Sequence, residues 1–304
     1  MNSPKINPYF ILVIGVITVS ASAILVKLCT SDSGVIAFYR LFFSVIIMLP
    51  IFLMKNIKEL KGITKRDWIF SIISGVCLAF HFILWFESLN YTSVASSTVL
   101  VTLQPLFAFI GTFFFFKESF SLKAILCGIC AVVGSVIISW GDFTVSGMAL
   151  FGDLLAFLAC ILVTAYLLFG QNVRQRLSLM TYTFIVYAIS SIVLIIYVLF
   201  AGESLLPTKQ TDWIYFILLA ILPTLLGHSL FNWVVKWLST SIISMAILFE
   251  PIGASILAYF ILQEKILWTQ IMGGAVIIIS ISLFIIDEKK SKAKALEKHA
   301  LHAQ

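Results

Sequence analysis

Ionisable and amide side chains interrupt the apolar runs of this chain at a few positions. They include His81, Gln104, His228, Asn232 and Glu250. Burying such a group without a partner is costly in hydrocarbon, so each needs a hydrogen-bond partner, water or a ligand. Histidine and glutamate also exchange protons, whereas glutamine and asparagine only donate and accept hydrogen bonds. These residue types are suited to contact a polar solute or to carry protons within a membrane.

Helical spacing places several of these residues on shared faces. His81, Trp85 and Ser88 fall at i, i+4 and i+7, and His228 and Asn232 are one turn apart. We expect each face to line a cavity, with histidine as a proton carrier or hydrogen-bond partner and Trp85 as an aromatic wall. The alternative is an ordinary helix contact that contains a satisfied histidine.

A second polar face precedes a proline in the first half of the chain. Thr98, Thr102 and Pro105 share one helical face, and Gln104 lies on the adjoining one. Proline leaves a backbone carbonyl unpaired, and such a carbonyl can bind a ligand. The alternative role for the threonines is helix packing, a common use of small polar residues in membranes. Gln104 is the best candidate here because a bulky amide has no reason to face lipid.

Glu250 is the leading candidate for proton coupling or for holding a substrate ammonium group. It immediately precedes a proline and aligns with Gln104 when the two halves of the chain are compared. Burial away from water favours the protonated form of a carboxylate, so protons are the candidate coupling ion. Alternatively, Glu250 forms a static pair with Arg40, His228 or Lys27.

Arg40 and Tyr166 complete the candidate set. Arg40 always carries charge, so within a helix it needs a carboxylate, carbonyls or water. We expect it to form a structural pair or a gate. Tyr166, Thr18 and Ser22 are weaker cavity candidates.

Composition identifies the class of protein that must position these residues. Hydrophobic residues make up 61% of the 304 positions and charged residues 11%, against roughly a quarter charged in soluble domains. Apolar runs of about 20 residues, the length needed to cross a bilayer, recur along the chain. We therefore expect an all-α polytopic membrane protein. The net charge of +6 comes from Lys and Arg between apolar runs, which indicates topology and no nucleic-acid partner.

We expect ten transmembrane helices. They cover 8–26, 35–54, 68–89, 94–116, 122–140, 147–173, 179–200, 213–237, 242–262 and 267–286. With this count, sixteen of the 20 Lys and Arg residues lie on the side of the termini and three on the other. The positive-inside rule then places both termini in the cytoplasm of a multi-pass cell-membrane protein. Residues 287–304 form a Lys-rich tail, expected to be a solvated helix or disordered.

The chain contains an internal repeat. Shifted by 146 positions, Pro105, Glu118 and Gly128 fall on Pro251, Glu264 and Gly274. Each copy holds five spans, an odd number, so the copies must be inverted. We assign the first repeat to 1–145 and the second to 146–286. Inverted repeats allow one central site to open alternately to either face of the membrane.

At these residues the chain resembles EamA-type carriers of the drug/metabolite transporter superfamily. The similar segments are AFYR at 37–40, WFESLNYTSVASSTVLVTLQPLF at 85–107 followed by KE at 117–118, and GHSLFNWVVKWLSTSIISMAILFEPIGA at 227–254 followed by QE at 263–264. The resemblance covers about residues 8–286 and implies ten helices around a substrate cavity. It also implies transport of metabolites or drugs without fixing the substrate. One departure is that the second repeat has no counterpart of Arg40.

These features predict a secondary transporter, an exporter of an amino acid or similar small metabolite that works by alternating access. Import and multidrug efflux are alternatives, and a non-transporting scaffold is a remote one. No nucleotide-binding GxxxxGK[ST] motif and no HExxH or GxSxG motif is present. The two histidines within spans lie in separate repeats, without Cys or a carboxylate at metal-ligand spacing. We therefore expect no enzyme, no metal and no cofactor, and only a small-molecule substrate, lipid and coupling protons as partners.

Overall fold

The computed structural model describes residue 4 and residues 6–140, 147–263 and 266–302, and this part of the chain is helical apart from its turns. Nine helical segments of the described residues are long and apolar enough to span a bilayer. A tenth apolar helix, Leu122–Ile138, is shorter. The predicted all-α membrane fold is confirmed.

The elements follow the predicted spans, several of which consist of two or three consecutive helices. In the first repeat they are α1 (Pro8–Val19), α2 (Ser22–Leu28), α3 (Ser33–Ile51), η1 (Phe52–Asn56), η2 (Ile57–Gly62), α4 (Lys65–Tyr91), α5 (Val94–Val101), α6 (Gln104–Phe116) and α7 (Leu122–Ser139). In the second they are α8 (Gly147–Val173), α9 (Leu179–Ala201), α10 (Asp212–Leu219), η3 (Ala220–His228), α11 (Ser229–Val234), α12 (Thr240–Ile247), α13 (Glu250–Leu257), η4 (Ala258–Leu262) and α14 (Trp268–His302).

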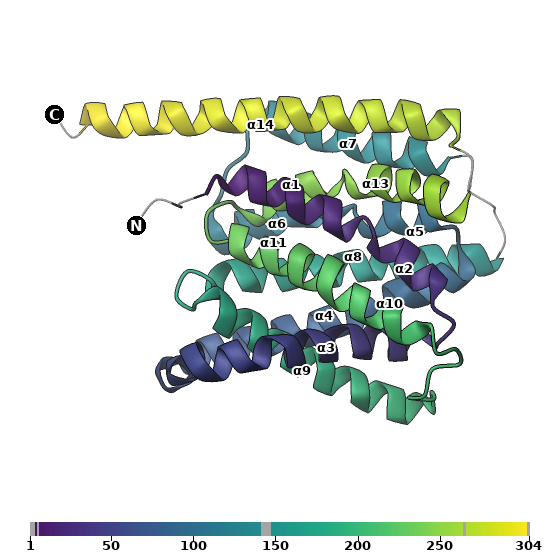
Figure 1. Cartoon of the computed structure of the whole chain (residues 1–304). Helices are drawn as coiled ribbons and strands as arrows, with labels where there is room; N and C mark the ends of the chain where they lie inside the picture. Colours follow the sequence, from purple (N-terminus) through teal and green to yellow (C-terminus); the bar gives the residue numbers. More distant parts are fainter. Residues whose placement is uncertain (1–3, 5, 141–146, 264–265, 303–304) are drawn as a thin grey trace.

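The first helices of the two repeats run in opposite directions. Tyr9 at the start of α1 donates a hydrogen bond to Glu288 near the end of the last span (2.8 Å). Lys27 at the end of α2 donates to the carbonyl oxygen of Leu89 in the last turns of α4 (2.5 Å). Gly152, near the start of α8, packs against the same end of α4. The first span therefore ends where α8 begins, and both chain termini lie at the other end of the bundle (Figure 1).

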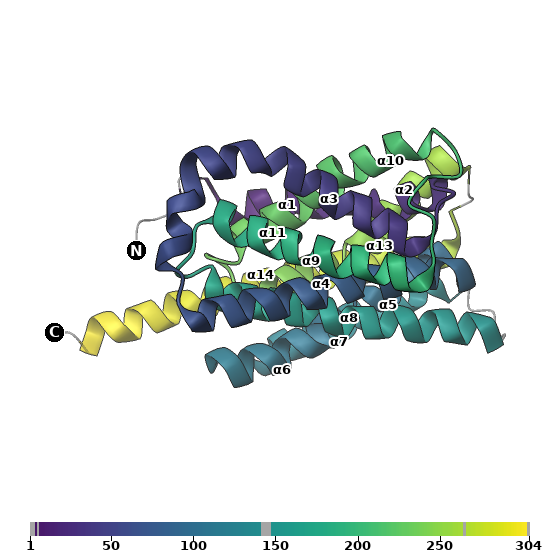
Figure 2. The same cartoon turned by 90° about the horizontal axis from the view of Figure 1, so that it is seen from below.

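The two repeats interdigitate. Helix α4 packs along α8 and α9, α3 along α9, α1 along η3 and α11, α6 along α12, and α7 along α14. If each helix is replaced by its equivalent in the other repeat, the contact of α1 with η3 and α11 becomes the contact of α8 with α4. The same replacement leaves the α3–α9 and α7–α14 pairs unchanged. Figure 2 shows α3 and α10 at one side of this bundle and α6 and α7 at the other. This pairing is the one that two inverted copies produce.

Two spans are broken at equivalent positions. Helix α5 ends at Val101 and α6 begins at Gln104, while α12 ends at Ile247 and α13 begins at Glu250. A proline follows the first residue of each new helix, and a proline nitrogen cannot donate the hydrogen bond that would continue the preceding helix. The repeated proline therefore explains both breaks, and it leaves a helix N-terminus in the middle of each span.

The first span also breaks, between α1 and α2, without a proline. The Ser20 hydroxyl donates to the carbonyl oxygen of Val16 (2.9 Å), and the Thr18 hydroxyl donates to carbonyls of α1 and to Leu226 of η3 (3.1 Å). Hydroxyls bonded to backbone carbonyls weaken a helix locally. In the eighth span, η3 is a π-helix that contains Pro223, as expected where proline disrupts the regular ladder.

Several predicted boundaries need correction. Helix α4 extends beyond both ends of the predicted span 68–89, and the spans 8–26, 94–116, 213–237 and 242–262 are interrupted. Helix α14 continues through the Lys-rich segment to His302 and projects past the bundle (Figure 1), so the tail is helical over its described residues. Glu264 and the predicted boundary between residues 145 and 146 lie outside the described residues.

Candidate functional site

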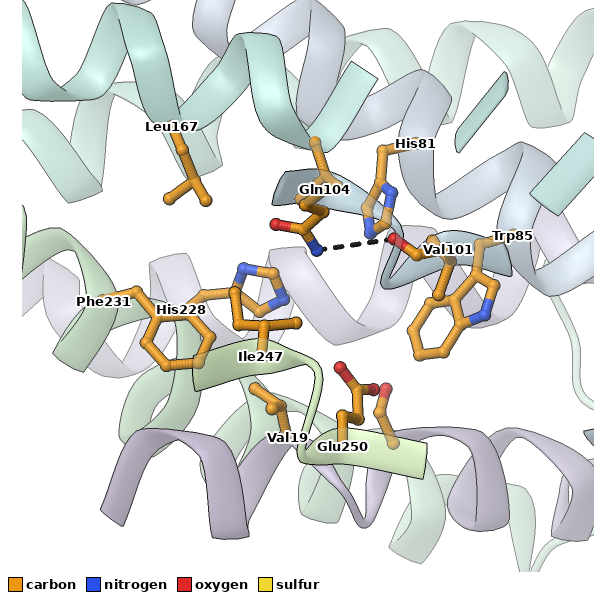
Figure 3. Close-up of a pocket in the computed structure, with 12 residues that line it drawn as sticks. Val19, His81, Trp85, Val101, Gln104, Leu167, His228, Phe231, Ile247 and Glu250 are labelled. Atoms are coloured by element: carbon orange, nitrogen blue, oxygen red, sulfur yellow. Dashed lines mark hydrogen bonds between the residues drawn. The ribbon is translucent and has the colours of Figure 1, made fainter. Parts of the chain in front are cut away.

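A small cavity lies where the broken spans meet, and each repeat contributes six of its lining residues. From the first repeat these are Val19, Ser22, His81, Trp85, Val101 and Gln104, and from the second Val163, Leu167, His228, Phe231, Ile247 and Glu250. Its volume of about 20 Å³ has room for roughly one water molecule. Figure 3 shows the labelled side chains converging on this space. As it stands, the cavity is closed and too small for a metabolite.

The cavity wall follows the internal repeat closely. Shifting by 146 positions places Trp85 on Phe231, Val101 on Ile247 and Gln104 on Glu250, and both members of each pair line the cavity. Opposite walls therefore have equivalent backbone positions but different side-chain chemistry.

Glu250 is the first residue of α13, and its carboxylate points into the cavity (Figure 3). The residue is 7% exposed. In the described part of the chain, the single salt bridge joins Arg176 to Asp67, so Glu250 forms no ion pair with Arg40, His228 or Lys27 there. A helix N-terminus favours negative charge, and this effect offsets part of the cost of burial. The carboxylate is therefore available to a proton or a ligand.

Arg40 lies behind the cavity wall and is fully buried. Its Nε donates to the Thr224 hydroxyl (2.7 Å) and its Nη1 to the Ser22 hydroxyl (2.8 Å). The guanidinium lies over the Phe82 ring, 4.1 Å from the ring centre, a favourable cation–π arrangement. Through Ser22, which lines the cavity, Arg40 connects the π-helix η3 to the candidate site.

The two histidines face each other across the cavity, with ring centres 6.5 Å apart. His81 Nδ1 lies 3.0 Å from the carbonyl oxygen of Ala159. Since a carbonyl only accepts, Nδ1 carries the proton and Nε2 of a neutral His81 is left as an acceptor. Trp85 stacks beside His81 with ring centres 5.8 Å apart.

Three fully buried polar atoms of cavity-lining residues have no hydrogen-bond partner among the described residues. They are Trp85 Nε1, Gln104 Oε1 and His228 Nδ1. The Gln104 amide nitrogen makes one long contact, 3.5 Å, with the carbonyl oxygen of Val101 (Figure 3). Buried polar atoms are normally paired with protein or water, so this cluster marks a place for a polar occupant.

Four predicted binding residues lie outside the lining. The Tyr166 hydroxyl donates to Asn232 Oδ1 (2.8 Å), so these two side chains satisfy each other. The Thr102 hydroxyl donates to the carbonyl oxygen of Thr98 (2.9 Å), and the Thr98 hydroxyl is buried. Their contact with a substrate stays a prediction, whereas His81, Trp85, Gln104, His228 and Glu250 are brought together by the fold.

The apolar part of the lining was not predicted. Single apolar letters carry little signal in a chain where most positions are apolar. A signal was present for Phe231, since it aligns with Trp85 in the repeat. Ser22 was a weaker candidate and does line the cavity.

The fold and the cavity define a polytopic membrane protein built from two inverted repeats around a closed central space. The sequence pattern of the EamA-like transporter family matches residues 7–140 and again 150–286. The chain belongs to this family. The membership confirms the resemblance drawn from the repeated proline and glutamate motifs and identifies the chain as a membrane transporter of small solutes.

Two similar proteins are also named transporters. Uncharacterized transporter YxxF of Bacillus subtilis is 27% identical over 196 residues, which are 64% of this chain and 62% of that relative, just under two thirds of its length. The riboflavin transporter ImpX of Fusobacterium nucleatum is 24% identical over 251 residues, 77% of this chain and 84% of that protein. A crystal structure with 13% identity superposes with a TM-score of 0.75, covering 93% of this chain and 98% of the solved chain. This last likeness concerns the fold alone.

Proposed function

We propose that this transporter is a secondary active carrier that exports a small, partly polar organic solute, such as an amino acid or similar metabolite, by alternating access. The observation that carries the proposal is the unpaired Glu250 carboxylate in a closed cavity shared equally by two inverted repeats. Such a cavity can open to either face when the repeats rock against each other. The chain has no nucleotide-binding motif, so the energy comes from a gradient, with the proton as the proposed coupling ion.

Contacts that close both ends of the bundle support an occluded state. At the end that holds the termini, Arg176 pairs with Asp67 (2.5 Å). At the other end, Asp212 Oδ2 accepts hydrogen bonds from the Thr30 amide (3.0 Å) and from the Ser31 hydroxyl (2.7 Å). Each set joins the two repeats. Opening one end requires breaking one set while the other remains.

The excess of Lys and Arg at the end of the termini supports a cytoplasmic location for both termini. We assign the first repeat to residues 1–145, the second to 146–286 and a cytoplasmic tail to 287–304. Import of the same class of solute is the second candidate, because inverted repeats do not define direction.

The cavity wall supports a solute with both an apolar ring or chain and polar groups. Trp85 and Phe231 supply apolar surface on opposite sides, and Gln104, His228 and Glu250 supply hydrogen-bonding groups. The name of the riboflavin transporter among the relatives fits this class, because riboflavin combines a flat ring with hydroxyl groups.

A thermal-shift screen of the purified carrier against a metabolite library, followed by counterflow in proteoliposomes with each hit, tests the proposal. We expect at least one hit to exchange across the membrane without ATP. Multidrug efflux is indicated instead if structurally unrelated drugs exchange and metabolites do not. Hits that stabilise the protein but never exchange would contradict a carrier.

A further inference from the structure

The membrane-facing surface of the bundle carries an apolar groove directly behind the central cavity. It lies between the α1–α2 break and α13, with a volume of about 400 Å³, and its lining includes Ile17, Ser20, Ala21, Phe249 and Ile256. Ile17 is 58% exposed and Ile256 is 45% exposed. In a membrane protein, exposed apolar side chains on transmembrane helices contact hydrocarbon, so the groove opens to the acyl chains of the bilayer.

Only one layer of residues separates this groove from the cavity. Along the first span, Val19 and Ser22 line the cavity, whereas the intervening Ser20 and Ala21 line the groove. Along the ninth span, Phe249 lines the groove and the next residue, Glu250, lines the cavity. The wall between lipid and the Glu250 carboxylate therefore consists of two helix breaks placed side by side.

Helix breaks make this wall weak. The regular α-helical pattern is interrupted at both breaks, where the Ala21 amide bonds to the Thr18 carbonyl and the Phe249 amide to the Ala246 carbonyl, three residues back. Such interruptions are points at which a helix bends. Gly253 of α13 faces Ser20 so closely that a Cβ there would overlap the serine hydroxyl. At this point the two segments touch through small residues.

The equivalent wall on the other side of the molecule is sealed. Shifting by 146 positions replaces Ser20 by Tyr166 and Gly253 by Phe107. Tyr166 is fully buried within the unbroken α8 and is fixed by Asn232, and the Phe107 ring packs edge-on against Phe157 with centres 5.6 Å apart. A groove beside α6 and α7 also comes within one residue of the cavity, since Pro105 lines that groove and Gln104 lines the cavity. The contact through small residues is therefore what distinguishes the α1–α13 side.

We propose that the groove between α1 and α13 is a membrane-side portal in which an acyl chain of the surrounding bilayer rests, and through which that chain reaches the central cavity when the two helix breaks separate. This lateral route is additional to the openings at the two ends of the bundle.

Carbene labelling of the full chain in vesicles tests the portal. The vesicles contain phosphatidylcholine, a fraction of which carries an alkyl diazirine within one acyl chain, and adducts are mapped by mass spectrometry after irradiation. We expect a lipid adduct on Glu250 as well as on the groove residues Phe249 and Ile256. Adducts on Ile256 with none on Glu250 would overturn the proposal.

A matched pair of variants controls for surface effects. Ile256→Trp places a bulky ring at the mouth of the groove, whereas Ile110→Trp makes the same change at the equivalent, 58% exposed position of the first repeat. We expect the Glu250 adduct to fall several-fold in Ile256→Trp and to be unchanged in Ile110→Trp. If both variants lower the Glu250 adduct equally, or if neither variant lowers it, the portal is also contradicted.

The labelling needs neither a solute nor a gradient, so it separates this inference from the proposed function. If the protein exchanges a solute by counterflow but Glu250 carries no adduct, the portal is contradicted and the proposed carrier function stands. If Glu250 carries an adduct but no solute exchanges by counterflow, the proposed carrier function is contradicted and the portal stands.

Discussion

Gln104 and Glu250 occupy the same place in the two repeats: each is the first residue of a helix that restarts a broken span, each is followed by proline, and both line one cavity. The backbone symmetry extends further, since Lys117 and Gln263, also 146 positions apart, both end their helices with a left-handed residue (φ 57° and 58°). The chemistry is not symmetric, because only the carboxylate of this pair can bind and release a proton. At this pair of equivalent positions the symmetric backbone therefore holds a carboxylate on one side of the cavity and an amide on the other.

Trp85→Phe should weaken binding of a solute identified by the screen. The indole Nε1 has no partner among the described residues, so its removal leaves no protein group unpaired, and only the packing lost with the smaller ring lowers the melting temperature. A hydrogen bond to the solute is worth about 1 kcal/mol, which corresponds to about a fivefold loss of affinity. Titration calorimetry checks the affinity and a thermal melt checks the fold.

Trp237→Phe is the matched control for this change. Trp237 Nε1 also lacks a partner among the described residues, but the side chain lines a different groove, at the end of the bundle that holds the termini. We expect the Trp237→Phe variant to bind the solute with the affinity of the wild type. Unchanged affinity of Trp85→Phe for every accepted solute would remove the indole nitrogen from the site.

Arg40→Lys should destabilise the carrier although the charge is retained. A single ammonium cannot reproduce the fork with which Arg40 holds both Thr224 and Ser22. Loss of one hydrogen bond from a charged donor costs about 1.5–3 kcal/mol. We expect a lower melting temperature and slower counterflow. Arg66→Lys is the control, because Arg66 is exposed and its guanidinium lies 5.1 Å from the Phe70 ring centre. This variant should melt at the temperature of the wild type. Equal melting temperatures of the two variants would contradict a structural role for Arg40.

The sequence predicted the internal repeat and the polar residues of the site better than the apolar residues that line the cavity. Proline and carboxylate are rare in so apolar a chain, so the recurrence of Pro105 and Glu118 as Pro251 and Glu264 indicated the repeat. The odd number of spans in each copy indicated its inversion. The two equivalent breaks were not predicted, because the spans 94–116 and 242–262 were expected to be continuous. His81, Gln104, His228 and Glu250 were recognisable for the same reason, since each is costly in hydrocarbon without a role.

Other features depend on contacts between distant helices. The break between α1 and α2 contains no proline or glycine, and it involves the Thr18 hydroxyl, which also bonds to Leu226 of the eighth span. Tyr166 and Asn232 looked like cavity residues because their polar groups are visible in the sequence, but their mutual hydrogen bond across 66 positions is not. The apolar lining was hidden by a composition in which most positions are apolar.

Cys29 reports on the end of the bundle opposite the termini. Its thiol lies in the turn after α2, where burial and the nearby Asp212 carboxylate raise its pKa to about 12. Because only the thiolate reacts readily, labelling by a maleimide should be slow at neutral pH and should accelerate as the pH rises towards 12. Asp212→Asn removes the negative charge and weakens the hydrogen bonds to Thr30 and Ser31, so labelling should become faster at neutral pH.

A background in which the other four cysteines are replaced by alanine isolates this signal. A membrane-impermeant maleimide added outside intact cells should label Cys29 if both termini are cytoplasmic. Labelling only after permeabilisation would reverse the topology, and an unchanged rate in Asp212→Asn would show that Asp212 does not restrict access at this end.

The most direct test of proton-coupled exchange through the cavity is the pH profile of solute flux in proteoliposomes for Glu250→Gln, compared with Glu118→Gln at the end of α6. We expect Glu250→Gln to abolish net pH-driven flux, or to make the remaining exchange independent of pH, while Glu118→Gln keeps the wild-type profile. Wild-type flux with a wild-type pH profile in Glu250→Gln would contradict proton-coupled exchange through the cavity.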